Sequence, residues 1–389
     1  MAKPKILWVS DLVVPTGFGR VSHSILEHLT DKYNVIGLGI NYRGDPHQYN
    51  FPVFPAGVGG KIFGEDRLAT MLNGDKFDII FFLNDSWVIS NYLEYIKKNV
   101  TTPLPKIVAY FPVDSENHDP MWYRDFNMLA KAVTYTEYGK AVVNEPKCKP
   151  DLELEIIPHG VNQDLFYRKY TNRVDAKKIL VGKEKNPNSF IFLNANRNQP
   201  RKKLDITLKA FQLFAEDKDD VLIHCHCGVK DSSINVAAVS QRLGIDNKLI
   251  LTNLHNGVQT VSDAALNEIY NSADAGLNSC MGEGWGLPNV EHAMTGAPQI
   301  VPDHSACAEI FSDCGLLVPT VTKFMFDNSM TVGKLITPEA MAEKMNLLYS
   351  DKDLYKKLSD KSIEKFSNPK YSWKKIAGDW DELFSGVLS

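Results

Sequence analysis

The sequence predicts an α/β protein built from two doubly wound parallel sheets. Short apolar runs alternate with helical patterns along the chain, and a polar stretch at residues 161–188 interrupts this alternation once before it resumes. Continuous apolar strands between helices are typical of parallel sheets that are covered on both faces. The chain has 389 residues, 44% of them hydrophobic, which is enough apolar material for two cores.

The strand-like runs form two sets of six. Helical patterns separate several of them, most clearly at residues 19–33, 204–218 and 262–273. No sequence repeat relates the two sets, which share only their rhythm. The first set is KILWVS (5–10), YNVIGLGI (33–40), FDIIFFLN (77–84), KIVAYFPV (106–113), AVTYTE (132–137) and LEIIPHG (154–160), and the second is SFIFLNAN (189–196), VLIHCHCG (221–228), KLILTNL (248–254), ADAGLNS (273–279), PQIVP (298–302) and GLLVP (315–319).

The same alternation predicts the domain limits. We expect an N-terminal Rossmann-like domain at 1–165, a charge-rich linker at 166–188 and a C-terminal Rossmann-like domain at 189–370. Apolar residues recur near helical spacing in residues 371–389, which predicts an amphipathic helix. We expect this helix to cap a core and to cross back to the first domain. The cleft between two such domains is the default ligand site.

Composition excludes several classes of protein. A net charge of −4 argues against a broad surface for nucleic acid or anionic membranes. No apolar run approaches the roughly 18–20 residues of a membrane helix, and Asp11 interrupts the apolar N-terminal run, so we expect a soluble, cytoplasmic protein. The six cysteines form no disulfide framework. The alternating residues 224–227 (HCHC) point to opposite faces of a strand and do not make a zinc site by themselves.

One stretch, GEGWGLPNVEHA (282–293), carries the clearest chemical signal. Its glycines allow close backbone approach, and Pro288 suits the first turn of a helix, whose N-terminal amides favour phosphate. Glu283 and Glu291 flank this turn, and a carboxylate accepts hydrogen bonds from a pair of neighbouring hydroxyl groups. Two such diols on either side of a diphosphate describe a sugar nucleotide. A glutamate that only complements the helix dipole explains Glu291 but not the glycines.

EGWGLPNVE is similar to the E-x7-E signature of retaining glycosyltransferases of the GT-B fold, especially family 4. The resemblance continues through EHAMTGAPQIVPDHSACAEIF (291–311), covers most of residues 185–320 and extends only loosely to the first domain. It implies that Glu283 orients the hexose and Glu291 the ribose. The donor-binding residues expected in the motif are Glu283, Gly284, Trp285, Gly286, Leu287, Asn289 and Glu291. The whole sequence also resembles glycosyltransferases of large algal viruses.

NANRNQPRKKLD (194–205) supplies a second signal at the end of another strand. Arg197 and Lys202 are spaced as in the family motif, and two fixed cations suit a diphosphate leaving group whose negative charge grows during the reaction. Lys203 stands where the family usually has glycine, which leaves the backbone geometry of this loop open. An exposed basic loop is the alternative interpretation of this stretch taken alone.

The first domain offers weaker signals. VPTGFGR (14–20) follows the first strand, and Gly17, Phe18 and Gly19 either contact phosphate or acceptor, as a glycine-rich loop does in family 4, or only shape a turn. YFPVDSENHDP (110–120) ends another strand, where family members often carry a histidine near the reacting sugar. Asp114 or His118 is the expected counterpart here.

The resemblance implies a hexosyltransferase that transfers sugar to an acceptor hydroxyl, on a glycan or another molecule, with retention of anomeric configuration by a front-face mechanism. Arg197, Lys202 and Glu283, with His118 or Asp114, are the expected catalytic residues. The leading donor is GDP-mannose, followed by UDP-glucose. No convincing Asp-x-Asp motif ends a strand, so we expect no metal and no other cofactor.

Three other functions remain open on sequence grounds. A sugar-nucleotide epimerase has the same architecture and needs no acceptor. A dinucleotide-dependent oxidoreductase requires G-x-G-x-x-G after the first strand, but GFGRVS has serine at the third glycine. A non-catalytic protein that binds sugar nucleotides would leave the donor intact with every acceptor.

Overall fold

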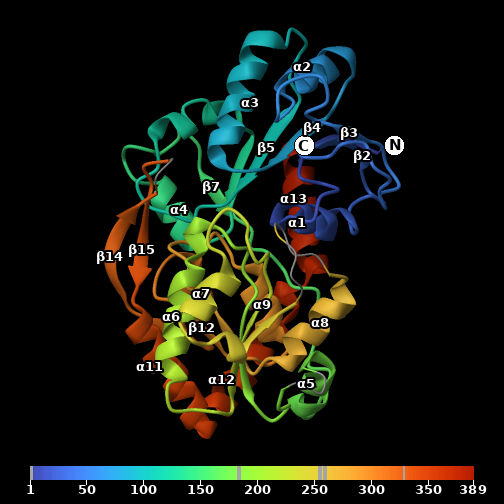
Figure 1. The fold of residues 1–389 in the computed structure, drawn as a ribbon. Helices are drawn as coiled ribbons and strands as arrows, with labels where there is room; N and C mark the ends of the chain where they lie inside the picture. The colour runs from blue at the N-terminus through green and yellow to red at the C-terminus, as the bar shows by residue number, and fades with distance from the viewer. Residues whose placement is uncertain (1–2, 182–184, 253–255, 257–260, 327–328) are drawn as a thin grey trace. The chain divides into compact units, whose positions relative to one another are not determined.

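The computed structural model describes residues 3–181, 185–252, 256, 261–326 and 329–389. The chain divides into two compact units, one formed by Met1–Gly160 with Lys370–Ser389 and the other by Val161–Pro369 (Figure 1). We call them unit 1 and unit 2. Each contains a parallel sheet with helices, so the predicted fold class is confirmed.

Unit 1 is built on a seven-stranded sheet in the order β3-β2-β1-β4-β5-β6-β7. All neighbouring strands are parallel, and Ile6 of the first strand pairs with Val35 on one side and Ile79 on the other. Its one strand outside the predicted runs is the short edge strand β3. The strands are β1 (Lys5–Ser10), β2 (Asn34–Gly39), β3 (Val53–Pro55), β4 (Ile79–Leu83), β5 (Lys106–Phe111), β6 (Lys131–Thr134) and β7 (Leu154–Ile156).

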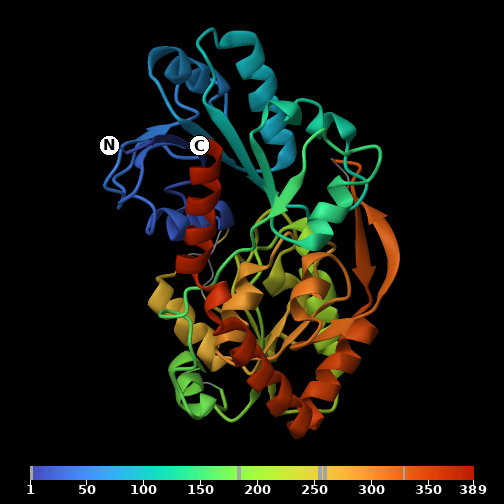
Figure 2. The same cartoon turned by 180° about the vertical axis from the view of Figure 1, so that it is seen from behind.

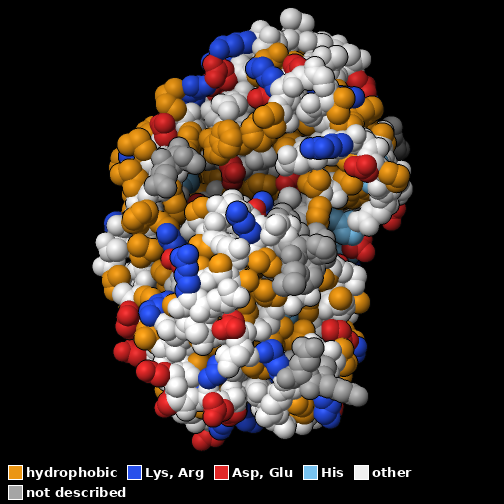
Figure 3. Space-filling model, in the orientation of Figure 1, with side chains coloured by type: hydrophobic (Ala, Val, Ile, Leu, Met, Phe, Trp, Pro, Cys, Tyr) orange, Lys and Arg blue, Asp and Glu red, His pale blue; other side chains and the backbone are white. Residues whose placement is uncertain are grey.

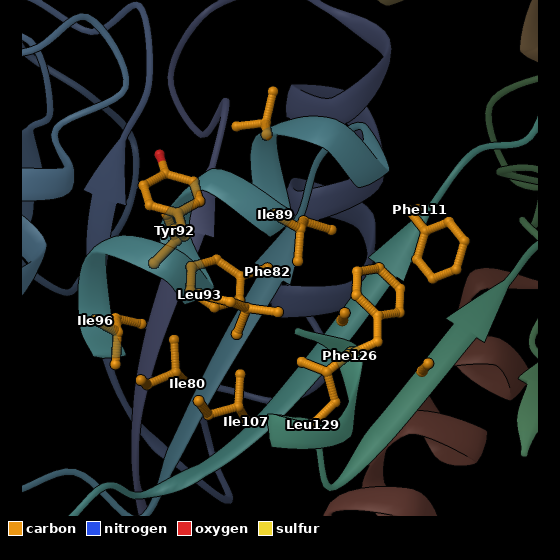
Figure 4. Packing of buried hydrophobic residues seen from close by; sticks show 14 of the residues in the cluster. Ile80, Phe82, Ile89, Tyr92, Leu93, Ile96, Ile107, Phe111, Phe126 and Leu129 are labelled. Atoms are coloured by element: carbon orange, nitrogen blue, oxygen red, sulfur yellow. The ribbon is translucent and has the colours of Figure 1, made fainter. Parts of the chain in front are cut away.

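The core of unit 1 packs helix α3 against the strands. Phe82 of β4 stacks on Tyr92 of α3 with ring centroids 5.0 Å apart and an interplanar angle of 17° (Figure 4). Apolar residues recur every three or four positions along this helix because one face lies on the sheet. The helices of the N-terminal part are α1 (Gly17–Leu26), α2 (Glu65–Gly74), α3 (Ser86–Asn99) and α4 (Glu137–Val143).

The C-terminal helix α13 (Trp373–Leu388) belongs to unit 1. It lies beside α1, as the view from behind shows (Figure 2). Trp380 is fully buried, and its ring centroid lies 4.9 Å from that of Phe81 and 4.7 Å from that of Tyr110. Asp381 accepts a hydrogen bond from the Tyr33 hydroxyl at 2.8 Å. The amphipathic tail thus covers the sheet of the unit in which the chain begins.

Unit 2 contains a six-stranded parallel sheet in the order β10-β9-β8-β11-β12-β13. All six strands coincide with predicted runs, although residues 253 and 254 of KLILTNL lie outside the described residues. The strands are β8 (Phe190–Asn194), β9 (Val221–Cys225), β10 (Leu249–Leu251), β11 (Ala275–Leu277), β12 (Gln299–Pro302) and β13 (Gly315–Val318).

The helices of unit 2 include one inside the predicted linker. Residues Arg173–Val181 form α5, which packs on α8. The buried ammonium of Lys177 binds Asp274 at 2.6 Å and the Ser189 carbonyl at 2.8 Å, so this segment is anchored to the sheet of unit 2. The other helices are α6 (Leu204–Phe214), α7 (Val236–Arg242), α8 (Asp263–Ser272), α9 (Leu287–Met294), α10 (Ser305–Phe311), α11 (Pro338–Ser350) and α12 (Lys352–Phe366).

Unit 2 also carries an antiparallel hairpin that the sequence analysis does not predict. It consists of β14 (Thr320–Met325) and β15 (Val332–Ile336). Its second strand is attached to the loop after β11, because the Lys334 amide donates to the Met281 carbonyl at 2.9 Å. On the face of the molecule shown in Figure 3, acidic and basic side chains are interspersed over both units.

Candidate active site

Each sheet has one point at which the order of its strands along the chain reverses. In unit 1 the chain order reverses between β1 and β4, and in unit 2 between β8 and β11. Ligands of doubly wound sheets bind beyond the carboxyl ends of the strands at such a point. In unit 2 the loops that leave these two ends carry the motifs NANRNQPRKKLD and GEGWGLPNVEHA. The topology therefore brings together two motifs that lie about eighty residues apart in the chain.

Lys202 and Glu283 form a buried ion pair between these two loops. Their side chains are in direct contact, and the residues are only 7% and 8% exposed. Lys202 Nζ also donates to Asn196 Oδ1 at 3.0 Å. These are the two hydrogen-bond partners of the ammonium among the described residues, so one of its three donors remains for a ligand.

Glu283 is held in its ionised form. Burial by itself raises the pKa of this carboxyl group, but the positive charges of Lys202 and Arg201 outweigh it and hold the pKa below its usual range. Arg201 Nη1 lies 3.7 Å from Glu283 Oε1 and donates to the Gly282 carbonyl at 2.5 Å. The sequence analysis chose Arg197 and Lys202, and not Arg201, as the cations of the site. The position of Arg201 in the basic run beside Lys202 was the available signal.

Arg197, the other predicted cation, has a different partner. Its guanidinium binds the carboxylate of Asp231, with Nε 2.7 Å from Oδ2, and its side chain is 45% exposed. The described contacts thus bring Arg201 to Glu283, while Arg197 faces the loop after β9. Next to it, Asn198 is fully buried and donates to the carbonyls of Gly228 and Ile234, which anchors that loop.

The backbone conformation of Lys203 answers whether the loop keeps its geometry without the glycine that the family usually has at this position. Its φ of +49° and ψ of +48° lie in the left-handed region that glycine favours. The chain therefore keeps the turn at some backbone cost. Lys203 Nζ lies 5.5 Å from the ring centroid of Phe324 on the β14–β15 hairpin, a cation–π contact that offsets part of this cost.

The glycine-rich stretch adopts the predicted turn before α9. Gly286 has φ +91° and precedes Leu287 and Pro288 in the first turn of the helix. A Cβ atom at Gly286 would lie 3.4 Å from Glu283 Cγ, so the turn is formed close to this glutamate. The Glu283 amide donates to Ser305 Oγ at 3.1 Å, and Ser305 itself has φ +52°. The backbone on both sides of Glu283 is thereby fixed.

Glu291 and Asn289 lie within α9 and are buried. Glu291 Oε2 accepts a hydrogen bond from the Tyr270 hydroxyl at 2.8 Å. Asn289 bridges Asn278 and Gln299, accepting from the first and donating to the second, each at 2.9 Å. Asn289 thus links α9 to the end of β11 and to the start of β12. Gly284 and Trp285 are buried in the same turn, and Leu287 is half-buried.

In unit 1, the two glycines of VPTGFGR have different surroundings. Thr16 caps α1, and its hydroxyl accepts from the Gly19 amide at 3.1 Å. A Cβ atom at Gly19 would lie 2.2 Å from the Val14 carbonyl oxygen, so Gly19 is explained by the turn alone. Gly17 is exposed with nothing within 4 Å of a Cβ position, and Phe18 is half-buried beside it. The turn therefore accounts for Gly19 but not for Gly17.

His118 is enclosed within unit 1. It is 4% exposed, and its Nδ1 and Nε2 lie 2.5 Å from the Tyr123 hydroxyl and 3.3 Å from the Ser115 hydroxyl. Burial lowers its pKa to about 4, so the imidazole is neutral near pH 7. Asp114, on the same loop, is half-buried and more accessible. Of the two side chains expected at this strand end, Asp114 is therefore the more exposed.

Comparison with known proteins adds to this geometry. Residues 175–365 match the family model of glycosyl transferases group 1. A search of curated protein sequences found no match. Among solved structures, the chain is similar to a sucrose-phosphate synthase from Thermosynechococcus elongatus, with a TM-score of 0.76 at 14% identity over 100% of this chain and 99% of that one.

Two further structures have the same fold. A glycosyltransferase from Rickettsia africae matches with a TM-score of 0.73 at 17% identity, covering 100% of both chains. Alr3699/HepE of Anabaena, solved in complex with UDP-glucose, matches with a TM-score of 0.72 at 12% identity, covering 98% of this chain and 99% of that one. The family match and these neighbours support a glycosyltransferase with the GT-B fold.

None of the helices in the described part of the chain combines the length and the apolar character that crossing a membrane requires.

Proposed function

We propose that this chain is a retaining glycosyltransferase that moves a hexose from a nucleoside diphosphate sugar to an acceptor hydroxyl. The observation that carries the proposal is the buried Lys202–Glu283 pair at the switch point of unit 2, beside the N-terminus of α9. Helix amides and an ammonium at this point suit a diphosphate, and the carboxylates suit hydroxyl groups. The family match over residues 175–365 supports the same reaction class.

In the proposed reaction, a bond forms between the acceptor oxygen and the anomeric carbon while the bond from that carbon to the diphosphate oxygen breaks. The acceptor proton passes to the leaving diphosphate. Lys202 stabilises the charge that grows on the leaving group, with Arg197, which lies on the same loop and pairs with Asp231 in this structure, as a second cation. Glu283 orients the hexose, and Glu291 binds the ribose hydroxyls.

The protein cations at this site support a reaction without a metal ion. We propose two donors for direct comparison. The sequence resemblance favours GDP-mannose, while the neighbour from Anabaena was solved with UDP-glucose. A thermal-shift panel of GDP-, UDP- and ADP-sugars identifies the donor, since a ligand that binds only the folded state raises the melting temperature.

The proposal is tested by incubating the identified donor with a set of acceptors, with and without EDTA. We expect nucleoside diphosphate and a glycoside of unchanged anomeric configuration, and we expect activity in EDTA. Lys202→Ala should lower kcat more than donor affinity, because the ammonium acts mainly on the developing charge. An isomerised donor without acceptor would instead establish an epimerase, and an intact donor with every acceptor would establish a binding protein.

A further inference from the structure

Aromatic side chains gather beside residues 16–20 of unit 1, which we call the glycine loop, in the segment that follows β2. We call residues 41–51 the aromatic loop. Its rings form a continuous series at the carboxyl ends of β1 and β2, and His23 of α1 adjoins it. The ring centroids are 5.9 Å apart for Tyr42 and His47, 5.8 Å for His47 and Tyr49, 4.8 Å for Tyr49 and Phe51, and 5.8 Å for His23 and Tyr49.

The aromatic loop is tied to the same strand end as the glycine loop. Asp11, which directly follows β1, is buried and accepts hydrogen bonds from Thr16 Oγ1 at 2.7 Å and from Asn41 Nδ2 at 3.0 Å. Thr16 begins the glycine loop and Asn41 begins the aromatic loop. The Tyr49 hydroxyl donates to the Leu12 carbonyl at 2.9 Å. One buried carboxylate and one tyrosine thus hold both loops in a defined arrangement.

Tyr42 and Phe51 are buried, so His47 and Tyr49 supply the accessible ring surface of the loop, beside polar groups. His23, His47 and Tyr49 are half-buried, while Arg43 and Gln48 are exposed. Gln48 Nε2 lies 3.2 Å from His23 Nδ1, which places an amide beside the rings. Nδ1 of His47 is buried and has no hydrogen-bond partner among the described residues. Such a nitrogen is costly to leave unpaired, which points to a ligand hydroxyl or a water molecule as its partner.

These features match the chemistry of a saccharide. A pyranose presents apolar C–H faces that stack on aromatic rings, and hydroxyl groups that bond to amide, guanidinium and imidazole groups. The loop also lies at the strand ends next to the switch point of unit 1, where doubly wound sheets bind ligands. Gly17, on the adjoining loop, is exposed and has no atom within 4 Å of a Cβ position.

We propose that the aromatic loop binds a saccharide, and that the acceptor of the transfer reaction is therefore itself a sugar. That the acceptor is a sugar rests on the proposed function. Saccharide binding by the aromatic loop concerns unit 1 alone and is tested without any donor.

The experiment measures saccharide binding by saturation-transfer difference NMR with the full chain. The probes are methyl glycosides and disaccharides of glucose, mannose and galactose, with glycerol and a serine-containing peptide as hydroxyl compounds that are not sugars. Tyr49→Leu removes the ring, whereas Tyr49→Phe keeps the ring and removes only the bond to Leu12. His47→Ala removes the second ring. Tyr95→Leu changes a half-buried tyrosine on α3 and serves as the control.

We expect at least one sugar probe to bind, with affinity reduced about tenfold or more in Tyr49→Leu and His47→Ala and retained in Tyr49→Phe and Tyr95→Leu. Equal binding by all variants would overturn the proposal, as would binding of glycerol or the peptide in place of sugars. Nucleotide binding is measured in the same samples. If nucleotide binds and no sugar does, the saccharide site fails and the proposed function stands. If sugar binds but no sugar nucleotide does, the proposed function fails instead.

Discussion

Glu283 has a partner in the structure that its place in the sequence does not reveal. The motif predicts a carboxylate that faces sugar hydroxyls, and the structure shows that carboxylate already neutralised by Lys202. Because one donor of the Lys202 ammonium remains for a ligand, Lys202 can contact the leaving diphosphate of the proposed reaction while it stays paired with Glu283. A charge pair that is preorganised in this way needs little rearrangement at the moment of reaction. The contributions of individual side chains at this site can therefore be measured by single substitutions.

Glu291→Ala should weaken nucleotide binding by about 1–3 kcal/mol, because it removes the carboxylate proposed to accept hydrogen bonds from the ribose. Isothermal titration calorimetry with the nucleoside diphosphate measures this effect. Tyr270→Phe is the matched control, since it removes the 2.8 Å bond to Glu291 and leaves the carboxylate in place. If Tyr270→Phe weakens nucleotide binding as much as Glu291→Ala, the glutamate acts through local structure and the ribose assignment is wrong.

Lys203→Gly should be more stable than Lys203→Ala by about 1 kcal/mol, because φ is +49° at this position and glycine carries no Cβ penalty there. Both variants lose the contact with Phe324, so their difference isolates the backbone cost. Urea unfolding of the two proteins measures it. Equal stabilities, or a more stable alanine variant, would contradict a strained backbone at Lys203.

At the scale of elements, α13 shows how a segment remote in sequence completes a core. The spacing of its apolar residues predicts an amphipathic helix, and α13 begins and ends close to the predicted range. Pattern alone does not say which sheet the helix covers. The ring contacts of Trp380 with Phe81 and Tyr110 place it on unit 1.

Trp380→Ala should destabilise unit 1 by roughly 3–5 kcal/mol, because it leaves a large cavity beside Phe81 and Tyr110. Differential scanning calorimetry measures the shift in melting temperature. Lys374→Ala changes an exposed residue of the same helix and should shift stability by no more than about 0.5 kcal/mol. A small effect of Trp380→Ala would show that α13 contributes little to the core.

At the scale of the whole molecule, buried histidines occur in both units. Burial lowers the pKa of five of them to about 3 or about 4. His224 and His226 both contact Thr252 on one side of β9, and Cys225 and Cys227 lie in the core on the other, as the alternation of a strand requires. The five histidines and their pKa values are His118 (about 4), His159 (about 3), His224 (about 3), His226 (about 4) and His292 (about 3).

Stability should therefore fall as the pH drops below about 6.5. The unfolded chain takes up protons on these histidines near their ordinary pKa of 6.5, whereas the folded chain takes them up only near 3–4. Within this window each histidine lowers the free energy of unfolding by up to about 1.4 kcal/mol for each unit by which the pH falls. Glu283 adds to the loss below its ordinary pKa of 4.5, because its folded pKa is lowered.

Urea unfolding between pH 7.5 and 5 measures this dependence. His159→Gln should reduce the slope of unfolding free energy against pH by the contribution of up to one proton, which is about 1.4 kcal/mol per pH unit. His28→Gln changes an exposed histidine and serves as the control. A stability that stays constant from pH 7.5 to 5 would contradict the burial of neutral histidines.

The sequence by itself determined the strand runs, the doubly wound class and the two motifs of unit 2. These depend on hydrophobic period and on residues within a few positions of one another, which local sequence encodes. Only the tertiary structure decided that Lys202 pairs with Glu283, that Arg197 pairs with Asp231, and that His118 is enclosed by Tyr123 and Ser115.

Those pairings depend on which strands become neighbours and on how loops fold at their ends, and residue spacing carries no record of either. The β14–β15 hairpin was missed for a related reason. Five of the six residues of β14 are exposed, so it lacks the buried apolar face by which the other strands were found. The aromatic loop is likewise assembled by Asp11, which joins Thr16 to a residue 25 positions further on only because β1 and β2 are adjacent.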